Sequence, residues 1–226
     1  MNRPINFPFN TLEKAQTNSM IAQPYSAFIV FITVCMLFYF LFQTKNIHVI
    51  LVLISTILFS SFHMLSHAFH IPGNLQVNFV HSSAYLIFIS LFSLLYSISK
   101  VFPSIYFIIF CVIIILLDIY AFFNLSLVYF ATTQFILNLS LLYYYQNYLP
   151  TNFKQNLPII VFLLILTTII ITLEKKYGDI LLEKYPDFPF HAINEVVGFI
   201  FFYIVLENFR EIFINFNNFK FMLSVK

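Results

Sequence analysis

Long apolar stretches alternate with short polar segments along almost the whole chain. The hydrocarbon core of a bilayer, about 30 Å thick, requires about 20 mainly apolar residues in a spanning helix. Seven stretches meet this requirement: residues 25–43, 47–70, 77–98, 101–122, 124–146, 157–173 and 189–209. The pattern therefore predicts an all-α integral membrane protein, a seven-transmembrane helix bundle with its termini on opposite sides of the membrane.

Prolines mark several of the predicted boundaries. Pro72-Gly73-Asn74 indicates the turn between the second and third helices, and Pro103 fits the first turn of the fourth. Pro150 and Pro158 are expected to bracket a loop, because proline removes a backbone donor and disrupts a helix interior. Pro24 is expected to end a short interfacial helix that begins near Thr11.

The pattern divides the chain into three parts. Residues 1–24 form a polar or interfacial N-terminal segment, residues 25–210 the seven-helix transmembrane domain, and residues 211–226 a C-terminal tail. The first segment lacks the basic start and adjoining apolar core of a cleaved signal peptide, so the first span is expected to act as the insertion signal.

Composition supports a membrane protein and narrows the function classes. The chain is 61% apolar and 9% charged, against about 25% charged residues in soluble domains. A net charge of +2 without a basic face argues against nucleic-acid binding, and nothing indicates an obligate protein partner. Cys35 and Cys111 lie inside apolar stretches and are interpreted as packed hydrophobic residues.

Lysine positions favour one orientation. Lys45, Lys100 and Lys154 lie in loops on the C-terminal side, which favours a cytoplasmic C-terminus and an N-terminus outside. The segment 174–188, expected to be a loop on the other side, weakens the contrast because it mixes lysines with acids. The absence of Trp and the abundance of Phe, Asn and Ile suggest an AT-rich bacterial genome, so the bacterial inner membrane is the expected location.

Histidines are concentrated where the second predicted helix ends and the third begins. His70 ends one span and His81 lies near the start of the next, while His191 and Glu195 share a helix face at the start of the seventh. Connectivity brings these positions to similar depth in the membrane. An unpaired carboxylate such as Glu195 costs about 2.5–3.5 kcal/mol on insertion scales, so it should have a partner.

Three imidazoles and a carboxylate are a donor set that suits zinc. Bound zinc lowers the pKa of its water to about 7 and polarises a carbonyl, which favours transfer of an acyl group to water. The same four residues can instead serve packing or interfacial hydrogen bonding without a metal.

Other polar residues have simpler interpretations. His63 and His67 extend the face of Ser66 and His70 and are assigned packing or outer-shell roles, and His48 an interfacial hydrogen bond. Asp118 and Glu207 are expected to reach the interface from near their helix ends. Interhelical hydrogen bonds are expected for the polar residues of the fifth helix, Thr132, Thr133, Gln134 and Asn138.

The motif Ser66-His67-Ala68-Phe69-His70, with His81 and His191-Ala-Ile-Asn-Glu195, resembles the alkaline ceramidase family. This family belongs to the wider superfamily of seven-span membrane hydrolases that includes adiponectin-receptor-like proteins. The family carries Ser-x-x-x-His in its second span, Asp at the start of the third and His-x-x-x-His in the seventh. Ile21-Ala22-Gln23-Pro24 is also similar to the family's sequence before the first helix.

Two positions depart from the family pattern. His81 stands where the family has Asp, and Glu195 where it has the second His of the seventh span. The resemblance implies zinc ligands His70, His191 and Glu195, with His81 as a possible fourth. It implies catalytic roles for Ser66, through its hydroxyl, and for His81, as the group that orients water or acts as general base, although the roles of His81 and Glu195 can be exchanged.

The resemblance implies a zinc-dependent lipid amidohydrolase whose ceramide-like substrate enters from the bilayer. Another lipid amide or an ester fits the residues equally well. The family's acidic N-terminal calcium segment is not matched, since only Glu13 stands there, and no calcium site is expected. The alternative is a non-catalytic seven-span protein, receptor-like or acting in transport or assembly, with a structural His/Glu cluster.

Overall fold

The computed structural model describes residues 20–69, 73–123, 127–185, 188–210 and 212–213, with the side chains of 73–77, 121–131 and 175 left aside. Within these ranges the chain is helical and contains no strand, so the predicted all-α class is confirmed. The helices are α1 Pro24–Gln43, α2 Ile47–Ala68, α3 Gly73–Ser99, α4 Ile105–Phe123, α5 Leu127–Tyr144, the short 3-10 helix η1 Gln146–Tyr148, α6 Thr151–Lys184 and α7 Phe190–Asn208.

Five of these helices have the length and apolar character needed to cross a membrane in their described residues. They are α1, α2, α3 from Asn78, α6 as far as Glu174, and α7. The apolar part of α4 that the structure describes, Ile105–Tyr120, is shorter. The helices are thus compatible with a multi-pass membrane protein, and the count of seven spans stays a prediction for α4 and α5.

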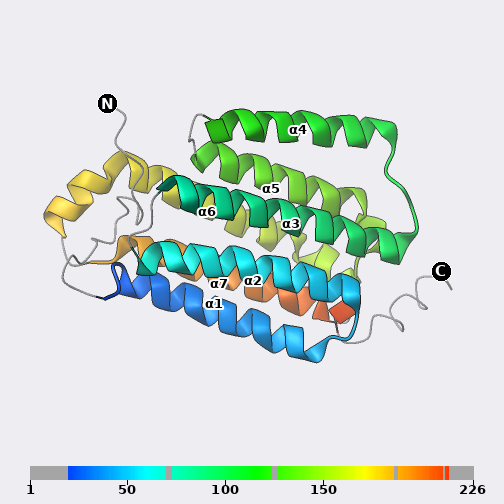
Figure 1. The fold of residues 1–226 in the computed structure, drawn as a ribbon, viewed down its shortest axis with the longest axis horizontal. Helices are drawn as coiled ribbons and strands as arrows, with labels where there is room; N and C mark the ends of the chain where they lie inside the picture. Colours follow the sequence, from blue (N-terminus) through cyan, green and yellow to red (C-terminus); the bar gives the residue numbers. More distant parts are fainter. Residues whose placement is uncertain (1–19, 70–72, 124–126, 186–187, 211, 214–226) are drawn as a thin grey trace.

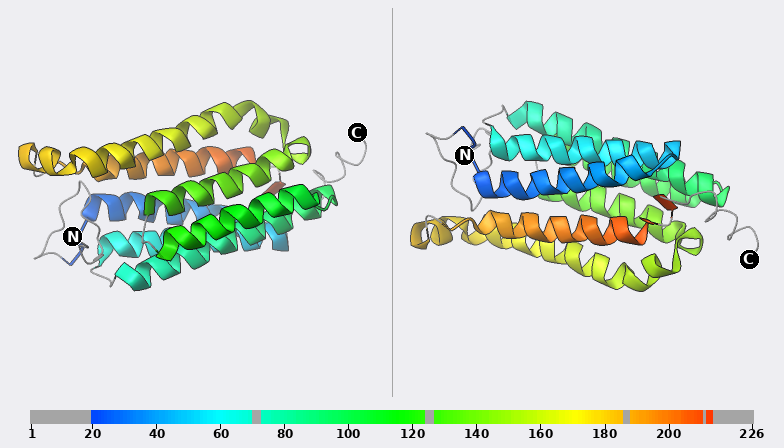
Figure 2. Two further views of the ribbon diagram at one scale, coloured as in Figure 1. Left: turned by 90° about the horizontal axis from the view of Figure 1, so that it is seen from above. Right: turned by 90° about the horizontal axis from the view of Figure 1, so that it is seen from below.

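The long helices run nearly parallel to one another and form a closed arrangement (Figures 1 and 2). α1 packs between α2 and α7, α2 packs on α3, and α6 packs on α7. The hairpin of α4 and α5 leans on α3 through α5, and α5 also meets α6. Because consecutive helices alternate in direction, the start of α1, the end of α2, the end of α6 and the start of α7 meet at one end of the bundle.

The prolines have other roles in the structure than predicted. Pro24 occupies the first turn of α1 and begins that helix; residues 11–19 of the predicted interfacial helix lie outside the described ranges. Pro150 is the N-cap residue of α6, and Pro158 lies inside this helix. No loop separates the two prolines. α6 continues through Pro158, although this proline lacks the backbone donor for the carbonyl oxygen four residues earlier. The buried Phe153 side chain packs against Phe209 and holds this part of α6 on the bundle.

The segment after residue 173 is also different from the prediction. α6 continues for 34 residues to Lys184, so most of the expected loop 174–188 is helix. At 1.5 Å per residue such a helix is about 51 Å long, longer than the bilayer core. Its continuation places Glu174 on the same helix as the apolar span, where its side chain can reach the start of α7.

Apolar packing fixes the end of the bundle opposite the meeting point of α1, α2, α6 and α7. Leu37, Leu53, Leu94, Leu141 and Tyr145 are among its fully buried side chains. α4 is different, since most of its large apolar residues, such as Leu116, are exposed. A surface of this kind is suited to contact with lipid tails.

Candidate metal-binding site

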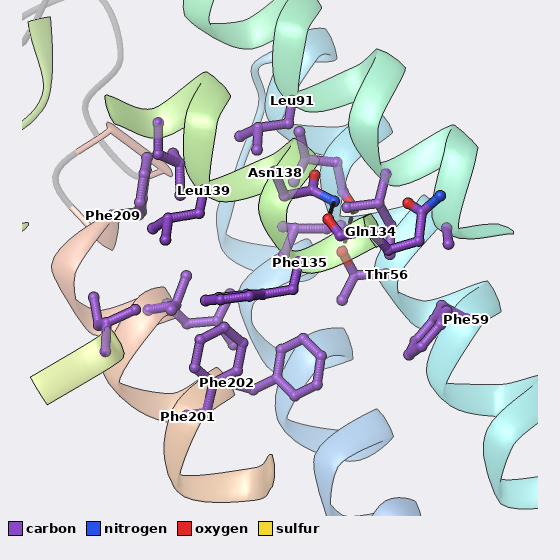
Figure 3. A pocket seen from close by; sticks show the side chains of 18 of the residues that line it. Thr56, Phe59, Leu91, Gln134, Phe135, Asn138, Leu139, Phe201, Phe202 and Phe209 are labelled. Carbon is purple, nitrogen blue, oxygen red and sulfur yellow. Dashed lines mark hydrogen bonds between the residues drawn. The ribbon is translucent and has the colours of Figure 1, made fainter. Parts of the chain in front are cut away.

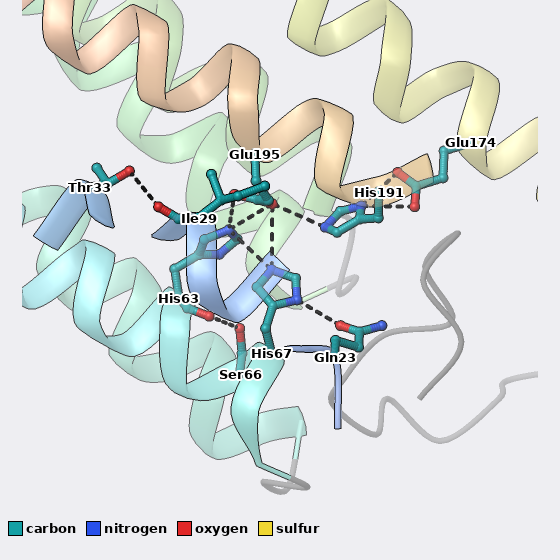
Figure 4. Close-up of polar contacts among 9 residues, drawn as sticks. All are labelled: Gln23, Ile29, Thr33, His63, Ser66, His67, Glu174, His191 and Glu195. Carbon is teal, nitrogen blue, oxygen red and sulfur yellow. Dashed lines mark hydrogen bonds and ion pairs between the residues drawn. The ribbon is translucent and has the colours of Figure 1, made fainter. Parts of the chain in front are cut away.

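Four side chains from α2 and α7 converge at the end of the bundle where α1 begins (Figure 4). We call them the histidine cluster: His63, His67, His191 and Glu195. All three imidazoles present Nε2 to the Glu195 carboxylate, at 3.2 Å from His63, 3.5 Å from His67 and 3.1 Å from His191. Glu195 is only 8% exposed, so this buried carboxylate has the partners that the sequence required.

Helix periodicity explains the convergence. His63 and His67 are one turn apart on α2, as are His191 and Glu195 on α7, so each pair shares a helix face. Ligating atoms of His63, His67 and Glu195 lie within 4.8 Å of one another, close enough to hold a single ion. This combination of two imidazoles and one carboxylate is a set used by hydrolytic zinc sites.

The Nδ1 atoms of two imidazoles are held by acceptors outside the cluster. His67 Nδ1 donates to the side-chain Oε1 of Gln23 at 2.7 Å. His191 Nδ1 faces both oxygens of the Glu174 carboxylate at 2.8 and 2.9 Å. Such outer hydrogen bonds fix the tautomer and orientation of metal-binding histidines.

The backbone holds Gln23 in place. The amide nitrogens of Ala22 and Gln23 donate to the carbonyl oxygens of Ala68 and His67, at 3.0 and 2.9 Å. These bonds satisfy carbonyl groups at the C-terminal end of α2, which have no partner within their own helix. They also attach the start of α1 to the helix that carries His63 and His67, with the Gln23 side chain fully buried.

The tautomer of His67 leaves an electrostatic problem inside the cluster. If the hydrogen sits on Nδ1 to reach Gln23, Nε2 carries a lone pair. That lone pair faces Glu195 Oε1 at 3.5 Å and His63 Nε2 at 3.4 Å. His67 is 4% exposed, so water screens these atoms poorly, and the contacts are favourable when a hydrogen on His63 Nε2 or a metal ion lies between them.

His191 bridges two carboxylates. Its Nδ1 is hydrogen-bonded to Glu174, and its Nε2 lies 3.1 Å from Glu195 Oε1 in an ion-pair contact without hydrogen-bond geometry. The bridge links the end of α6 to the start of α7 and orients Glu195 toward α2. His63 lies on the opposite side of Glu195 from His191 (Figure 4). Its side chain is 36% exposed, which makes it the most accessible member of the cluster.

An apolar cavity of about 350 Å³ lies deeper in the bundle, among α2, α3, α5, α6 and α7. Phe59, Phe135, Phe201, Phe202 and Phe209 contribute to its lining (Figure 3). Phe59 is one turn from His63 on α2, and the two rings are nearly parallel with centroids 6.4 Å apart. The cavity wall therefore extends from the bundle interior to the edge of the histidine cluster.

The predicted site residues are distributed unevenly in the structure. His191 and Glu195 meet as expected, whereas His70 lies outside the described residues. His81 is buried on α3. Ser66 is also buried, and its hydroxyl donates to the His63 carbonyl oxygen within α2.

Sequence reasoning missed four contributors to this site. The sequence alone assigns packing or supporting roles to His63 and His67, yet their i, i+4 spacing matches that of paired histidine ligands on one helix face. Glu174 falls within the predicted loop, although it ends an apolar stretch. Gln23 enters the sequence argument only as part of the Gln-Pro motif. No protein-family model matches this chain, and no curated protein or solved structure does either.

Proposed function

We propose that this protein is a zinc-dependent membrane hydrolase that cleaves a lipid amide resembling ceramide. The observation that carries the proposal is the meeting of the His67 and His63 Nε2 atoms with the buried Glu195 carboxylate, while Gln23 occupies the other nitrogen of His67. Nitrogen and oxygen acceptors gathered in this way can bind one divalent cation together. The seven-span topology with the N-terminus outside belongs to the same proposal.

The residues fit zinc in donor type and in outer support. His63, His67 and Glu195 would hold the ion, and His191 would either join them or remain beside Glu195. When bound, zinc would polarise a substrate carbonyl and lower the pKa of a coordinated water to about 7. Gln23 and Glu174 keep the imidazoles oriented, so little reorganisation is needed when the substrate arrives.

His191 is suited to move a proton. It is held between Glu174 and Glu195, so its imidazolium form is stabilised on both sides. When His191 remains beside Glu195 and does not bind the ion, it would donate its proton to the leaving nitrogen of the amide and regain one from the attacking water, while Glu174 holds the ring in position. The family resemblance assigns water orientation to His81 and an assisting hydroxyl to Ser66, and both remain proposals.

The cavity supports a lipid as substrate. Its volume of about 350 Å³ lies within the range of about 300–1,000 Å³ found for small-molecule sites. Its lining is dominated by Phe, Leu and Ile side chains, and Phe59 connects it to His63. A lipid could therefore place its chain in the cavity and its amide at the histidine cluster, entering from the bilayer between helices.

Elemental analysis of the full-length protein, purified without chelators, tests the proposal directly. We expect about one zinc per chain from the single donor set, and slow release of fatty acid from a ceramide-like amide. His67→Ala should abolish both. His48→Ala should change neither, because His48 lies at the other end of α2, where it pairs with Ser93 of α3. Absence of stoichiometric metal in the wild type would overturn the proposal.

A lipid panel separates the proposed enzyme from the non-catalytic alternative. Ceramide, a simple fatty amide and an ester with the same acyl chain would be compared in vesicles containing wild type or His191→Ala. Cleavage by wild type alone supports a hydrolase, and the preferred member of the panel identifies the bond. Retained metal with no cleavage of any lipid would instead favour a receptor-like, transport or assembly role.

A further inference from the structure

A second buried polar group lies at the junction of α3, α4 and α5. We call it the aspartate cluster: Tyr85, Asp118, Thr133 and Gln134. The hydroxyls of Tyr85 and Thr133 donate to the Asp118 carboxylate, and Gln134 Nε2 donates to it at 3.0 Å. Asp118 is 1% exposed. The prediction that it reaches the membrane interface is therefore wrong, because neighbouring helices provide its partners.

The three hydrogen-bond partners of Asp118 in the described part of the chain are all neutral. The sequences of α3, α4 and α5 contain no lysine or arginine, and Asp118 is their one carboxylate. His81 is the one imidazole on these helices, one turn before Tyr85. Hydrogen bonds lower the cost of a buried carboxylate, but they leave its charge uncompensated in an apolar environment.

The side-chain oxygen of Gln134, Oε1, is a further acceptor in the aspartate cluster. Gln134 is 7% exposed, and among the residues that the structure describes no donor reaches its Oε1. The amide is held near Asp118 by its other end, at 3.0 Å. Rotation about the last side-chain bond exchanges the amide oxygen and nitrogen, and would bring Oε1 toward the carboxylate when a cation lies between them.

We propose that the aspartate cluster is a binding site for a small monovalent cation, with sodium as the physiological ion. Asp118, Thr133, Gln134 and Tyr85 provide only oxygen ligands, which hard cations prefer over the nitrogen ligands of the histidine cluster. One carboxylate balances one positive charge, whereas a divalent ion would leave an excess charge inside the bilayer.

Occupation of this site would join three helices. Tyr85 lies on α3, Asp118 on α4, and Thr133 and Gln134 on α5. The α4–α5 hairpin packs on the remaining bundle mainly through α5, and Gln134 also lines the apolar cavity. Sodium would therefore strengthen the attachment of this hairpin and stabilise the cavity wall, independently of any reaction at the histidine cluster.

Thermal unfolding of purified full-length protein in detergent tests the site, with sodium, lithium, potassium and choline chlorides compared at equal ionic strength. Wild type is expected to gain about 3 °C or more in Tm in sodium relative to choline, with potassium less effective. Asp118→Asn should lose this gain while keeping its bound divalent metal. Asp179→Asn, which changes an exposed acid of α6, should keep the gain.

Direct binding of radioactive sodium provides a test that does not depend on a variant folding. Wild type should bind about one sodium per chain, reflecting its single carboxylate, and unlabelled sodium but not choline should displace it. Gln134→Leu should weaken binding while leaving Asp118 in place. Absence of bound sodium, equal Tm in all four salts, or an undiminished sodium response in Asp118→Asn would each overturn the proposal.

Discussion

Each of the two buried polar clusters surrounds one carboxylate, but the surrounding groups are chemically different. In the histidine cluster the carboxylate of Glu195 is surrounded by imidazoles, which can carry a proton or bind a metal through nitrogen. In the aspartate cluster Asp118 is surrounded by hydroxyl and amide groups, which can only donate hydrogen bonds or offer oxygen. The two carboxylates are therefore surrounded by different donor sets, nitrogen-rich in one cluster and rich in oxygen in the other.

The clusters also differ in how the chain supports them. Gln23 and Glu174 orient the rings of His67 and His191 from outside the histidine cluster, as expected for a site that must keep a fixed geometry. The hydrogen-bond partners of Asp118 among the described residues are the other members of the aspartate cluster. We infer that the first cluster is built for chemistry and the second for ion-dependent attachment of helices.

Neutralising each carboxylate in turn gives the largest predicted contrast. Glu195→Gln should reduce the affinity for zinc by more than the roughly 100-fold that follows loss of an outer partner, because it removes a ligand. Asp118→Asn should leave zinc affinity within about twofold, since additivity holds for distant sites. Titration of metal-free protein with zinc measures both values. Equal losses in the two variants would show that the clusters are not independent.

Loss of an outer carboxylate should have an intermediate effect. Glu174→Gln removes the charged acceptor of His191 Nδ1, and we expect zinc affinity to fall by about 10–100-fold. Glu183→Gln is the matched control, because Glu183 is exposed on the same helix. Zinc titration at one fixed pH compares the variants. An unchanged affinity in Glu174→Gln would mean that His191 does not support the metal site.

The fold class could be predicted because apolar helices long enough for a bilayer leave a clear pattern. Proline was less informative, since Pro24 begins α1 and Pro158 lies within α6. A proline shows where a backbone donor is missing, but only the surrounding packing decides whether the helix continues. The extension of α6 beyond residue 173 was missed because its charged residues look like those of a loop.

The sequence predicts part of the histidine cluster. His191 and Glu195, which contact each other in the structure, are recognisable because an i, i+4 pair with an intramembrane acid is unusual. His63 and His67 were undervalued because the family pattern drew attention to His70. The rotation of α2 about its axis decides which of its histidines face α7. This rotation cannot be predicted from a single sequence.

The polar residues of α5 were predicted more successfully. Thr133 and Gln134 make interhelical hydrogen bonds to Asp118, as expected. Asn138 is different, since its amide donates to the Gln134 carbonyl oxygen within α5. Burial of Asp118 itself could not be read from its position near the end of α4, because it depends on how α3 and α5 cover that face.

Removal of one neutral donor from the aspartate cluster should have a smaller effect than loss of either carboxylate. Tyr85→Phe removes the hydroxyl that donates to Asp118, and interhelical hydrogen bonds in membranes contribute about 0.6 kcal/mol on average. We expect a decrease in Tm of about 1–3 °C, measured in sodium, with zinc content unchanged. Tyr203→Phe, at an exposed tyrosine of α7, is the control. A loss of zinc in Tyr85→Phe would contradict the separation of the clusters.

The smallest effect is expected for Ser66→Ala. The Ser66 hydroxyl donates to the His63 carbonyl oxygen one turn earlier in α2, and serine bonds of this kind slightly destabilise or bend a helix. Zinc affinity and Tm should therefore remain near the wild-type values, so any change in kcat for a lipid amide isolates a role of the hydroxyl in the reaction. A bond to the backbone alone predicts kcat within about twofold. A much larger decrease, with zinc retained, would mean that the hydroxyl leaves His63 during turnover and contacts the substrate, as the family resemblance implies.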